Sequence, residues 1–430
     1  MPIFALVDCN NFYASCEKLF DPTLKETPVV VLSNNDGCVV ARSAEAKALG
    51  IPMGAPWFQI SEAAERQGVV AYSSNYALYA DLSNRVVEVL SGFSPNVEVY
   101  SIDESFLELS GFAGVEPDLG AYGQRIRQRV ADWLGLAVCV GIAPTKTLAK
   151  LANHCAKKSL AGSEGVCDFT VLSYDALSRL FATIEVGEVW GVGRKIALRL
   201  DEMGIRTVEQ LRTADTELIR RRFSVVLERT VRELRGLSCL ALEEVAPPKQ
   251  QIMSSRSFSR LLTERRELEE AVASYMATAA EKLRRQRCLA GVVQVYIRTN
   301  IFKPNDPQYQ QSMALPLPVP SDDTRMLTAW ALRILLRIYR DGYAYHKAGI
   351  MLLDLIPLHQ RQTSLFGVEQ EEGGRPKAVM QVLDEINARY GRRTLQFAAE
   401  GVVRPWQMRR NRLSPRYTTK WDEIPAVLAR

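Results

Sequence analysis

The sequence contains little that would support a zinc site, a disulfide framework or a membrane anchor. Only three of its 430 residues are histidines, and none of its eight cysteines forms a Cys-x-x-Cys pair. A zinc site is therefore not expected, and the cysteines are interpreted as reduced thiols, mostly in cores. No apolar run approaches the roughly 20 residues that span a bilayer, and the N-terminal residues lack the basic region of a signal peptide. We expect a cytoplasmic protein.

The positive charge of the chain is concentrated near its C-terminus. The net charge is +5, and residues 374–430 alone carry 12 Lys or Arg against 5 Asp or Glu. This basic tail indicates an interaction surface, although a solvated tail with no single partner would have the same composition. The length suggests about three domains, and a hydrophobic content of 47% is ample for their cores.

Two acidic residues stand side by side in an apolar, β-prone stretch, YSIDESF (100–106). Its flanks predict a hairpin whose turn falls at or beside Asp103 and Glu104. Neighbouring side chains of a regular strand point to opposite faces, so these carboxylates share one ligand only where the strand bends or ends. A solvated turn is the alternative, but surface turns favour Gly, Asn or Pro over Ile102 and Phe106.

The order of elements around this hairpin predicts a ferredoxin-like sheet. Apart from an insertion at about 22–75, we expect a strand at 3–8, helical residues at 12–19 and 76–90, the hairpin, a helix at 119–134 and a strand at 137–142. In that topology the first strand lies beside the hairpin, so Asp8 approaches Asp103 and Glu104. Three converging carboxylates need a cation, and hard oxygen ligands favour Mg²⁺ over zinc. Two such ions about 4 Å apart can activate an attacking oxygen and stabilise a leaving one at phosphorus.

Two further modules follow along the chain. The stretch WGVGRK (190–195), with leucines at 198 and 200, predicts a helix-hairpin-helix over 190–207, whose Gly191 and Gly193 amides are free to meet a phosphate. An ordinary helical turn with core leucines is the alternative. Beyond the Pro-Pro pair at 247–248, a second β-α-β-β-α-β pattern is expected, with strands near 251–258, 291–298, 312–317 and 347–353 and helices at 266–287 and 324–339. It carries Arg256, Arg260 and Arg298 but no acid pair, which indicates a binding module.

Three stretches together resemble the Y-family translesion DNA polymerases: DCNNFYAS (8–15), YSIDESF (100–106) and GIAPTKTLAK (141–150). The stretch LSNNDGCVVAR (32–42) and the tail LSPRYTT (413–419) narrow the resemblance to UmuC-type catalytic subunits of DNA polymerase V. The resemblance implies template-directed, error-prone translesion synthesis by two-metal-ion nucleotidyl transfer in the SOS response to DNA damage. It also implies an α+β multidomain fold: a ferredoxin-like palm (1–21 and 79–167), fingers (22–78), a helical thumb (168–240), a second α+β domain or little finger (247–355) and a regulatory tail (356–430).

The same resemblance implies roles for single residues. Asp8, Asp103 and Glu104 would be catalytic and hold two Mg²⁺ ions, with the Cys9 carbonyl as an added ligand. Tyr13 matches the steric gate, whose ring lies under the sugar and disfavours a 2′-hydroxyl; spacing alone would make it a core aromatic residue. Primer–template DNA, dNTPs, a sliding clamp, a UmuD′ dimer and a RecA filament are the implied partners, and no membrane is among them.

The expected grip on the triphosphate departs from the family pattern. Lys47 and Lys146 match positions that hold the incoming triphosphate, although a solvated helix face is the usual place for a lysine. Many relatives carry Tyr where Ala44 stands and Arg where Lys47 stands. A point charge thus replaces a planar bidentate contact, and Arg42 is expected to contribute. DNA contacts are expected from Gly191, Gly193, Arg194, Lys195 and Arg256.

The stretch QTSLF (362–366) resembles the peptide that bacterial polymerases insert into the sliding-clamp groove. In that interpretation Gln362 contacts the rim of the groove, and Leu365 and Phe366 fill its apolar pocket. Packing of this pair onto the little finger is the alternative.

Two other functions compete with the polymerase. A diguanylate-type cyclase also uses an acidic hairpin and Mg²⁺, but it has no use for modules that follow a duplex. A non-catalytic scaffold on damaged DNA would gain nothing from the acid cluster of Asp8, Asp103 and Glu104.

Overall fold

The structure is a computed structural model that describes residues 2–243, 248–360 and 374–426. The chain divides into two compact units. The first comprises Met1–Ser33, Gly37–Ala246 and Arg412–Arg430, and the second comprises Asn34–Asp36 and Pro247–Asn411. Within the described residues, no helix is both long and apolar enough to cross a membrane.

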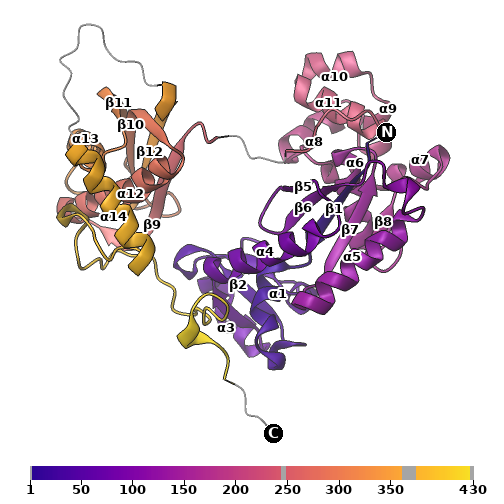
Figure 1. Cartoon of the computed structure of the whole chain (residues 1–430), viewed down its shortest axis with the longest axis horizontal. Coiled ribbons are helices and arrows are strands. Elements are labelled where there is room, and N and C mark those ends of the chain that lie inside the picture. The colour runs from indigo at the N-terminus through magenta and orange to yellow at the C-terminus, as the bar shows by residue number, and fades with distance from the viewer. Residues whose placement is uncertain (1, 244–247, 361–373, 427–430) are drawn as a thin grey trace. The chain divides into compact units, whose positions relative to one another are not determined.

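The first unit is built around a five-stranded sheet with the strand order β5-β6-β1-β7-β8 (Figure 1). Its strands are β1 (Phe4–Cys9), β5 (Val97–Val99), β6 (Glu104–Glu108), β7 (Val138–Ala143) and β8 (Val166–Asp168). The central strand β1 is antiparallel to both β6 and β7. This is the expected split βαβ arrangement, extended by β8, which runs parallel to β7 and was not anticipated from the sequence pattern.

Helices cover both faces of this sheet. The odd-numbered residues of β1 join the core formed with α1 (Phe12–Leu19), α4 (Tyr76–Ser91) and α5 (Leu119–Leu134). Phe4 and Leu6 point the other way, into the core formed with α6 (Lys146–Lys158). Because strand residues alternate between faces, Asp8 belongs to the face that α6 covers.

Gly141 of β7 allows α6 to lie directly on the sheet. A Cβ atom at this position would stand 2.1 Å from the backbone nitrogen of Asn153 and 2.3 Å from the carbonyl oxygen of Ala149. The side-chain amide of Asn153 then donates from Nδ2 to the carbonyl oxygens of Leu6, at 3.2 Å, and Cys139, at 2.8 Å. Glycine therefore sets the distance between α6 and the strands that carry the acids.

The insertion folds as a small three-stranded sheet with the order β3-β2-β4. Its elements are β2 (Val29–Leu32), β3 (Val39–Arg42), α2 (Ala44–Ala48), α3 (Trp57–Arg66) and β4 (Val70–Ser73). The sequence pattern predicts a strand at 28–32 and a short helix at 44–49, which correspond to β2 and α2, whereas β3, α3 and β4 were not anticipated.

Five helices follow the first unit's large sheet: α7 (Tyr174–Thr183), α8 (Arg194–Asp201), α9 (Val208–Thr213), α10 (Thr216–Arg222) and α11 (Val225–Leu234). Helices α8 and α9 are joined by a turn in which Gly204 has a φ of +77°. Helix α9 begins with a capping box between Thr207 and Gln210. Two short helices joined by a glycine turn thus occupy residues 194–213, so the second helix begins just beyond the 190–207 predicted for a helix-hairpin-helix.

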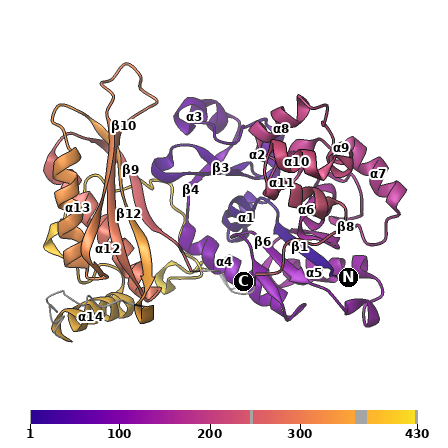
Figure 2. The same ribbon diagram turned by 90° about the horizontal axis from the view of Figure 1, so that it is seen from above.

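The second unit contains a four-stranded sheet with the order β11-β10-β12-β9 (Figure 2). Its elements are β9 (Ile252–Leu262), α12 (Arg265–Arg285), β10 (Cys288–Thr299), β11 (Gln310–Ser321), α13 (Thr324–Ile338) and β12 (Tyr345–Pro357). All six expected elements are present, with longer strands than the pattern indicated. Both α12 and α13 pack against one face of the sheet.

The tail expected at 356–430 divides between the two units. Helix α14 (Gly374–Tyr390) is attached to α12 by a bidentate ion pair between Arg284 and Asp384, with both N–O distances 2.7 Å. Trp406 is buried in the core of the second unit. From Arg412 onward the chain packs on the first unit instead. The tail is thus part of both cores because it contributes buried side chains to each.

Candidate active site

Strand pairing brings the three predicted acids together. Asp8 lies directly opposite Glu104 in the antiparallel pair of β1 and β6, so their side chains share one face of the sheet. Asp103 occupies the turn just before β6, where its carbonyl oxygen accepts a hydrogen bond from the Cys9 amide at 2.9 Å. Its carboxylate accepts a hydrogen bond from the Ser101 hydroxyl at 2.6 Å. Strand β6 begins at Glu104, so Asp103 lies outside the strand. This end of the strand is where two neighbouring carboxylates can face the same site.

Three lysines of α6 face acidic partners. Lys157 pairs with Asp8 at 2.5 Å, Lys150 pairs with Glu104 at 3.2 Å, and Lys146 pairs with the buried Glu98. Positions i, i+4 and i+11 lie within about 40° of one another on a helix of 3.6 residues per turn. This spacing was visible in the sequence, but only Lys146 was singled out. The lysines supply the positive charge that buried carboxylates need.

Burial controls the charge of Asp8. Desolvation raises the pKa of Asp8 to about 6, Lys157 opposes the rise, and the nearby Glu104 and Asp103 carboxylates add to it. Within the described residues, no three acidic, His or Cys side chains are gathered closely enough to enclose a metal ion. The donor set nevertheless fits Mg²⁺, because all three side chains offer hard oxygens at one end of the sheet.

A cavity of about 830 Å³ opens beside these acids. Asp8, Cys9, Asp103, Tyr13, Arg42 and Lys47 line it, so six predicted site residues meet in one space. Its walls also include Asn11, Lys157 and Lys158, which the sequence interpretation missed. Two other predicted site residues, Glu104 and Lys146, do not line this cavity.

The cavity is rich in positive charge. Burial lowers the pKa of Lys47, and so does repulsion from Arg42, Lys157 and Lys158. The Lys47 ammonium donates to the side-chain oxygen of Asn11. Arg42 donates from Nη1 to the carbonyl oxygen of Ile51 at 2.5 Å, while its buried Nε has no hydrogen-bond partner among the described residues. Such a concentration of cations favours an anionic ligand.

Lys146 lies elsewhere. Its side chain is only 4% exposed and forms an ion pair with Glu98, over the ring of Phe106 at 5.2 Å. In this structure the ammonium is held by a carboxylate rather than presented to the cavity. Its predicted contact with a triphosphate therefore stays a prediction.

Tyr13 is held by two other tyrosines. Its ring stacks on that of Tyr79, with a centroid distance of 4.4 Å and an interplanar angle of 17°, and meets Tyr76 edge-on at 6.2 Å. Tyr13 is half-buried and lines the cavity, so it is neither a pure core residue nor a free surface ring.

The predicted DNA-binding residues occupy two places. Gly191 has a φ of +90°, and Gly193 precedes α8 with no side chain capping that helix start, which is the arrangement that leaves backbone amides for a phosphate. Arg194 and Lys195 are the first residues of α8. Arg256 lies in the second unit, on the edge strand β9.

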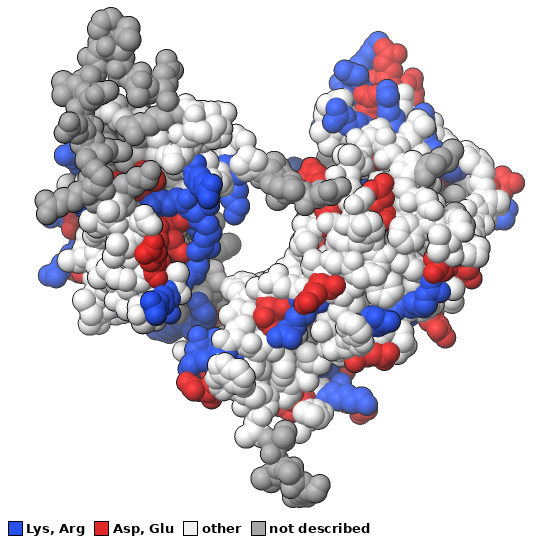
Figure 3. Space-filling view, viewed as in Figure 1, with Lys and Arg blue, Asp and Glu red and all other residues white. Residues whose placement is uncertain are grey.

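Arg256 lies on the helix-covered side of its sheet. It lines a cavity of about 380 Å³ with Tyr275 and Trp406. Lys282 shows how cationic this region is, because burial lowers its pKa and Lys249 and Arg256 lower it further. Lys and Arg also gather as a band on one side of the second unit in the view of Figure 3.

The open face of the same sheet has its own cations. Arg298 and Lys347 stand directly opposite each other in the pairing of β10 and β12. The Arg298 Nε is buried without a hydrogen-bond partner among the described residues. Both cations lower the pKa of His346 beyond the effect of its burial. The sequence had placed Arg298 in the binding module, but Lys347 was missed.

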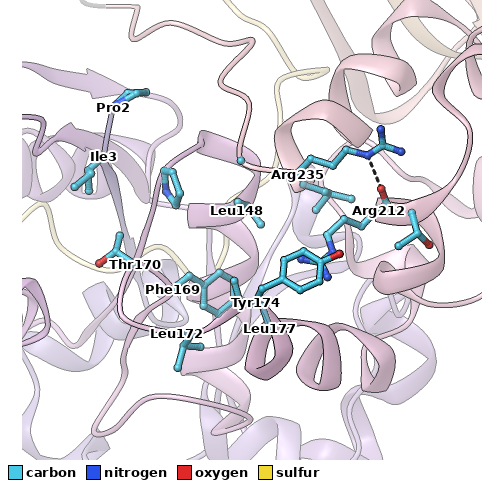
Figure 4. A pocket seen from close by; sticks show the side chains of 14 residues that line it. Pro2, Ile3, Leu148, Phe169, Thr170, Leu172, Tyr174, Leu177, Arg212 and Arg235 are labelled. Atoms are coloured by element: carbon cyan, nitrogen blue, oxygen red, sulfur yellow. Dashed lines mark hydrogen bonds between the residues drawn. The ribbon is translucent and has the colours of Figure 1, made fainter.

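A separate cavity of about 720 Å³ contains none of the predicted site residues (Figure 4). Leu148, Phe169 and Tyr174 form part of its wall. Arg235 donates from Nε to the carbonyl oxygen of Arg212 at 2.7 Å at its rim. The acids and this cavity are therefore distinct features. The predicted clamp peptide, with Gln362, Leu365 and Phe366, lies outside the described residues.

The sequence can now be compared with known proteins. The impB/mucB/samB family profile matches residues 7–154, and its C-terminal domain matches 249–365. Protein UmuC of Salmonella typhimurium is 49% identical over 425 residues, covering 99% of this chain and 100% of that protein. This chain belongs to the UmuC/ImpB/MucB/SamB family. MucB of Escherichia coli is 45% identical over 424 residues, covering 98% of this chain and 99% of its own. A domain of unknown function (DUF4113) matches residues 377–427.

Membership of the UmuC family makes the chain a Y-family, DNA-directed DNA polymerase that performs translesion synthesis in the response to DNA damage. DNA polymerase IV of Moorella thermoacetica is 27% identical over 407 residues, covering 91% of this chain and 94% of that protein. Solved structures show the same fold. A Y-family polymerase chimera of Dbh and Dpo4 has a TM-score of 0.65 at 19% identity, covering 83% of this chain and 99% of its own.

Proposed function

We propose that nucleotidyl transfer takes place where β1 meets β6, with Asp8, Asp103 and Glu104 as the catalytic carboxylates. The observation that carries the proposal is the direct pairing of Asp8 with Glu104, next to Asp103 and to a cation-rich cavity. Two Mg²⁺ ions would be held by these carboxylates and the Cys9 carbonyl. When bound, they would neutralise charge at the transferring phosphorus.

The residues of the cavity would position the nucleotide. Lys47 and Arg42 offer positive charge to the triphosphate at the cavity wall, and Lys146 would join them after leaving Glu98. Lys157 pairs with Asp8 and supplies the positive charge that bound Mg²⁺ would supply to this carboxylate. The Tyr13 ring, supported by Tyr79, would lie under the sugar and leave no room for a 2′-hydroxyl.

The remaining modules would bind the duplex. Amides of Gly191 and Gly193, with Arg194 and Lys195, would contact backbone phosphates without reading sequence. In the second unit we assign phosphate contacts to Arg298 and Lys347 on the open face, with Arg256 adding charge at the sheet edge.

We also propose the domain division that the family resemblance implies. We propose a palm at 1–21 and 79–167, fingers at 22–78, a thumb at 168–240 and a little finger at 247–355. The stretch 362–366 would bind a sliding clamp, and a UmuD′ dimer and a RecA filament would activate synthesis, as the family resemblance implies.

Primer extension tests this function. The substrate is a primer–template with one abasic site in the presence of Mg²⁺, with the UmuD′ dimer and RecA filament added or withheld. We expect dNTP addition opposite the abasic site. Cyclisation of GTP without primer extension would support the cyclase, and duplex binding without nucleotide addition under any of these conditions would support a scaffold.

A further inference from the structure

A short C-terminal segment is attached to the first unit at several points. We call Arg412–Tyr417 the strap. The Ser73 amide donates to the Arg412 carbonyl at 2.9 Å, and the Arg412 amide donates back to the Ser73 hydroxyl at 3.0 Å. The Arg412 guanidinium pairs with Glu65 of α3 at 2.8 Å. At the other end, the Tyr417 ring stacks on Phe20, just after α1, with centroids 4.5 Å apart. The strap thus lies along the three-stranded sheet of the insertion and reaches the end of α1 (Figure 1).

The middle of the strap is bound to the start of α4. Asn75 caps this helix by accepting a hydrogen bond from the Leu78 amide at 3.4 Å. Its Nδ2 donates to the Ser414 hydroxyl at 2.9 Å, the Ser414 carbonyl at 3.1 Å and the Pro415 carbonyl at 3.2 Å. Ser414 is 4% exposed and Asn75 is 2% exposed, so their hydrogen bonds are shielded from water. This start of α4 precedes Tyr76 and Tyr79, the two rings that contact Tyr13.

Ser414 also faces a buried carboxylate. Glu17 of α1 is 2% exposed, and its Oε1 accepts a hydrogen bond from the Tyr79 hydroxyl at 2.5 Å. Its Oε2 has no partner at ordinary hydrogen-bond distance among the described residues, but the Ser414 hydroxyl lies near enough to lower the Glu17 pKa. Burial acts in the opposite direction and is stronger, raising that pKa to about 7. The hydrogen bonds from Asn75 to Ser414 and from Tyr79 to Glu17 thus connect the strap, α4 and α1 around the Tyr79 ring.

We propose that the strap is a positioning element for sugar selection, in which Ser414 holds Asn75 at the start of α4, Asn75 and Glu17 hold Tyr79, and the Tyr79 ring sets the position of the Tyr13 ring. The inference rests on the proposed role of Tyr13 as the gate against ribonucleotides. It assigns a task to the LSPRYTT stretch, within the region matched by the domain of unknown function.

The test compares rNTP with dNTP insertion by the full chain. We expect Ser414→Ala to raise the ratio of kcat/KM for an rNTP to that for the matching dNTP by about fivefold to tenfold. Asn75→Asp keeps the helix cap but loses the donor to Ser414, so it should raise the ratio similarly. Thr419→Ala is the matched control, because it removes an exposed hydroxyl just beyond the strap and should leave the ratio unchanged.

A double variant separates the two proposals. If Ser414 acts through Tyr13, then Ser414→Ala will add nothing to the ratio in a Tyr13→Ala background. A high ratio in Tyr13→Ala with an unchanged ratio in Ser414→Ala would overturn the strap's role and leave the gate in place. An unchanged ratio in Tyr13→Ala would overturn the gate itself. Equal losses of rNTP and dNTP insertion in Ser414→Ala, together with a lower melting temperature, would reduce the strap to a purely structural part.

Discussion

The two large sheets of this polymerase have related patterns of strands and helices but opposite patterns of burial. All residues of β1 and β7 in the first unit are buried, because helices cover both faces. In the second unit, β10 alternates between buried and half-buried residues from Gly291 onward, because only one face is covered. The short, enclosed sheet carries Asp8 and Glu104, whereas the long, half-open sheet carries Arg298 and Lys347.

This difference has an electrostatic consequence. A carboxylate within an enclosed sheet is stabilised only by a cation fixed nearby, and α6 supplies Lys157 and Lys150 for that purpose. A cation on a half-open sheet keeps part of its side chain exposed and available to a large anion such as a nucleic acid backbone. The enclosed sheet of the first unit therefore suits a reaction at a single phosphorus atom. The half-open sheet of the second unit suits contact with many backbone phosphates.

The largest expected effect comes from removing one charge from the enclosed sheet. Asp103→Asn should reduce nucleotide addition at least about a thousandfold, since a metal ligand contributes several kcal/mol at the transition state. Primer extension measures the loss, and fluorescence polarisation with a labelled primer–template should show unchanged DNA affinity. Asp81→Asn, which removes a surface charge paired with Arg85, is the control and should remain active. Parallel loss of DNA affinity in Asp103→Asn would point to a folding defect.

A matched pair of glycine substitutions compares the packing of the two sheets. Gly141→Ala should destabilise the first unit by about 3 kcal/mol, because the new Cβ meets the backbone of α6. Gly349→Ala on β12 should cost less, about 2 kcal/mol, because its new Cβ meets the Ser255 Cβ of β9 and the half-exposed Tyr296 ring, and only the ring can move easily. Urea unfolding of each variant measures the difference. An equal loss of unfolding free energy in the two variants would show that the backbone of α6 moves as easily as the Tyr296 ring.

The sequence predicted the fold better than it predicted side-chain pairing. The alternation around Asp103 and the order of the elements sufficed to place β1 beside β6, because a topology fixes which strands are neighbours. Lys157 was missed because its partner, Asp8, is distant in sequence and a lysine on a helix is usually solvated. Arg256 was expected to contact DNA, but the sequence did not show that this exposed residue lies on the helix-covered side, since one residue of register decides the face.

Glu17 allows the effect of enclosure to be measured by pH. Burial raises its pKa from 4.5 to about 7, so the folded state keeps a proton that the unfolded state releases between these values. The parent should therefore lose stability relative to Glu17→Gln as the pH rises through this window. The stability difference between the two should change by up to about 3 kcal/mol across this window, because each unit of pKa difference is worth about 1.4 kcal/mol, whereas a weaker hydrogen bond from Tyr79 to the amide adds only a pH-independent offset.

Urea unfolding at about pH 4 and about pH 8 measures this difference. Glu269→Gln is the control from the second unit, where Glu269 forms a surface pair with Arg265 along α12 at 3.2 Å. It should change stability by less than about 0.5 kcal/mol at either pH. A pH-independent effect of Glu17→Gln would mean that the carboxyl group titrates alike in both states.

The smallest expected effect concerns single cations of the half-open sheet. Lys347→Ala should weaken binding of a primer–template by about 1 kcal/mol, equally for different sequences, and reduce the slope of log K against log salt by about 1. Arg256→Ala removes the same charge from the helix-covered side, so it should change that slope less. Arg266→Ala, on the exposed surface of α12, controls for net charge alone.

If all three variants lower the slope equally, only the total charge of the unit matters. If Arg256→Ala has the largest effect, DNA lies against the sheet edge and the cavity beside Trp406, and the open face is not the binding surface.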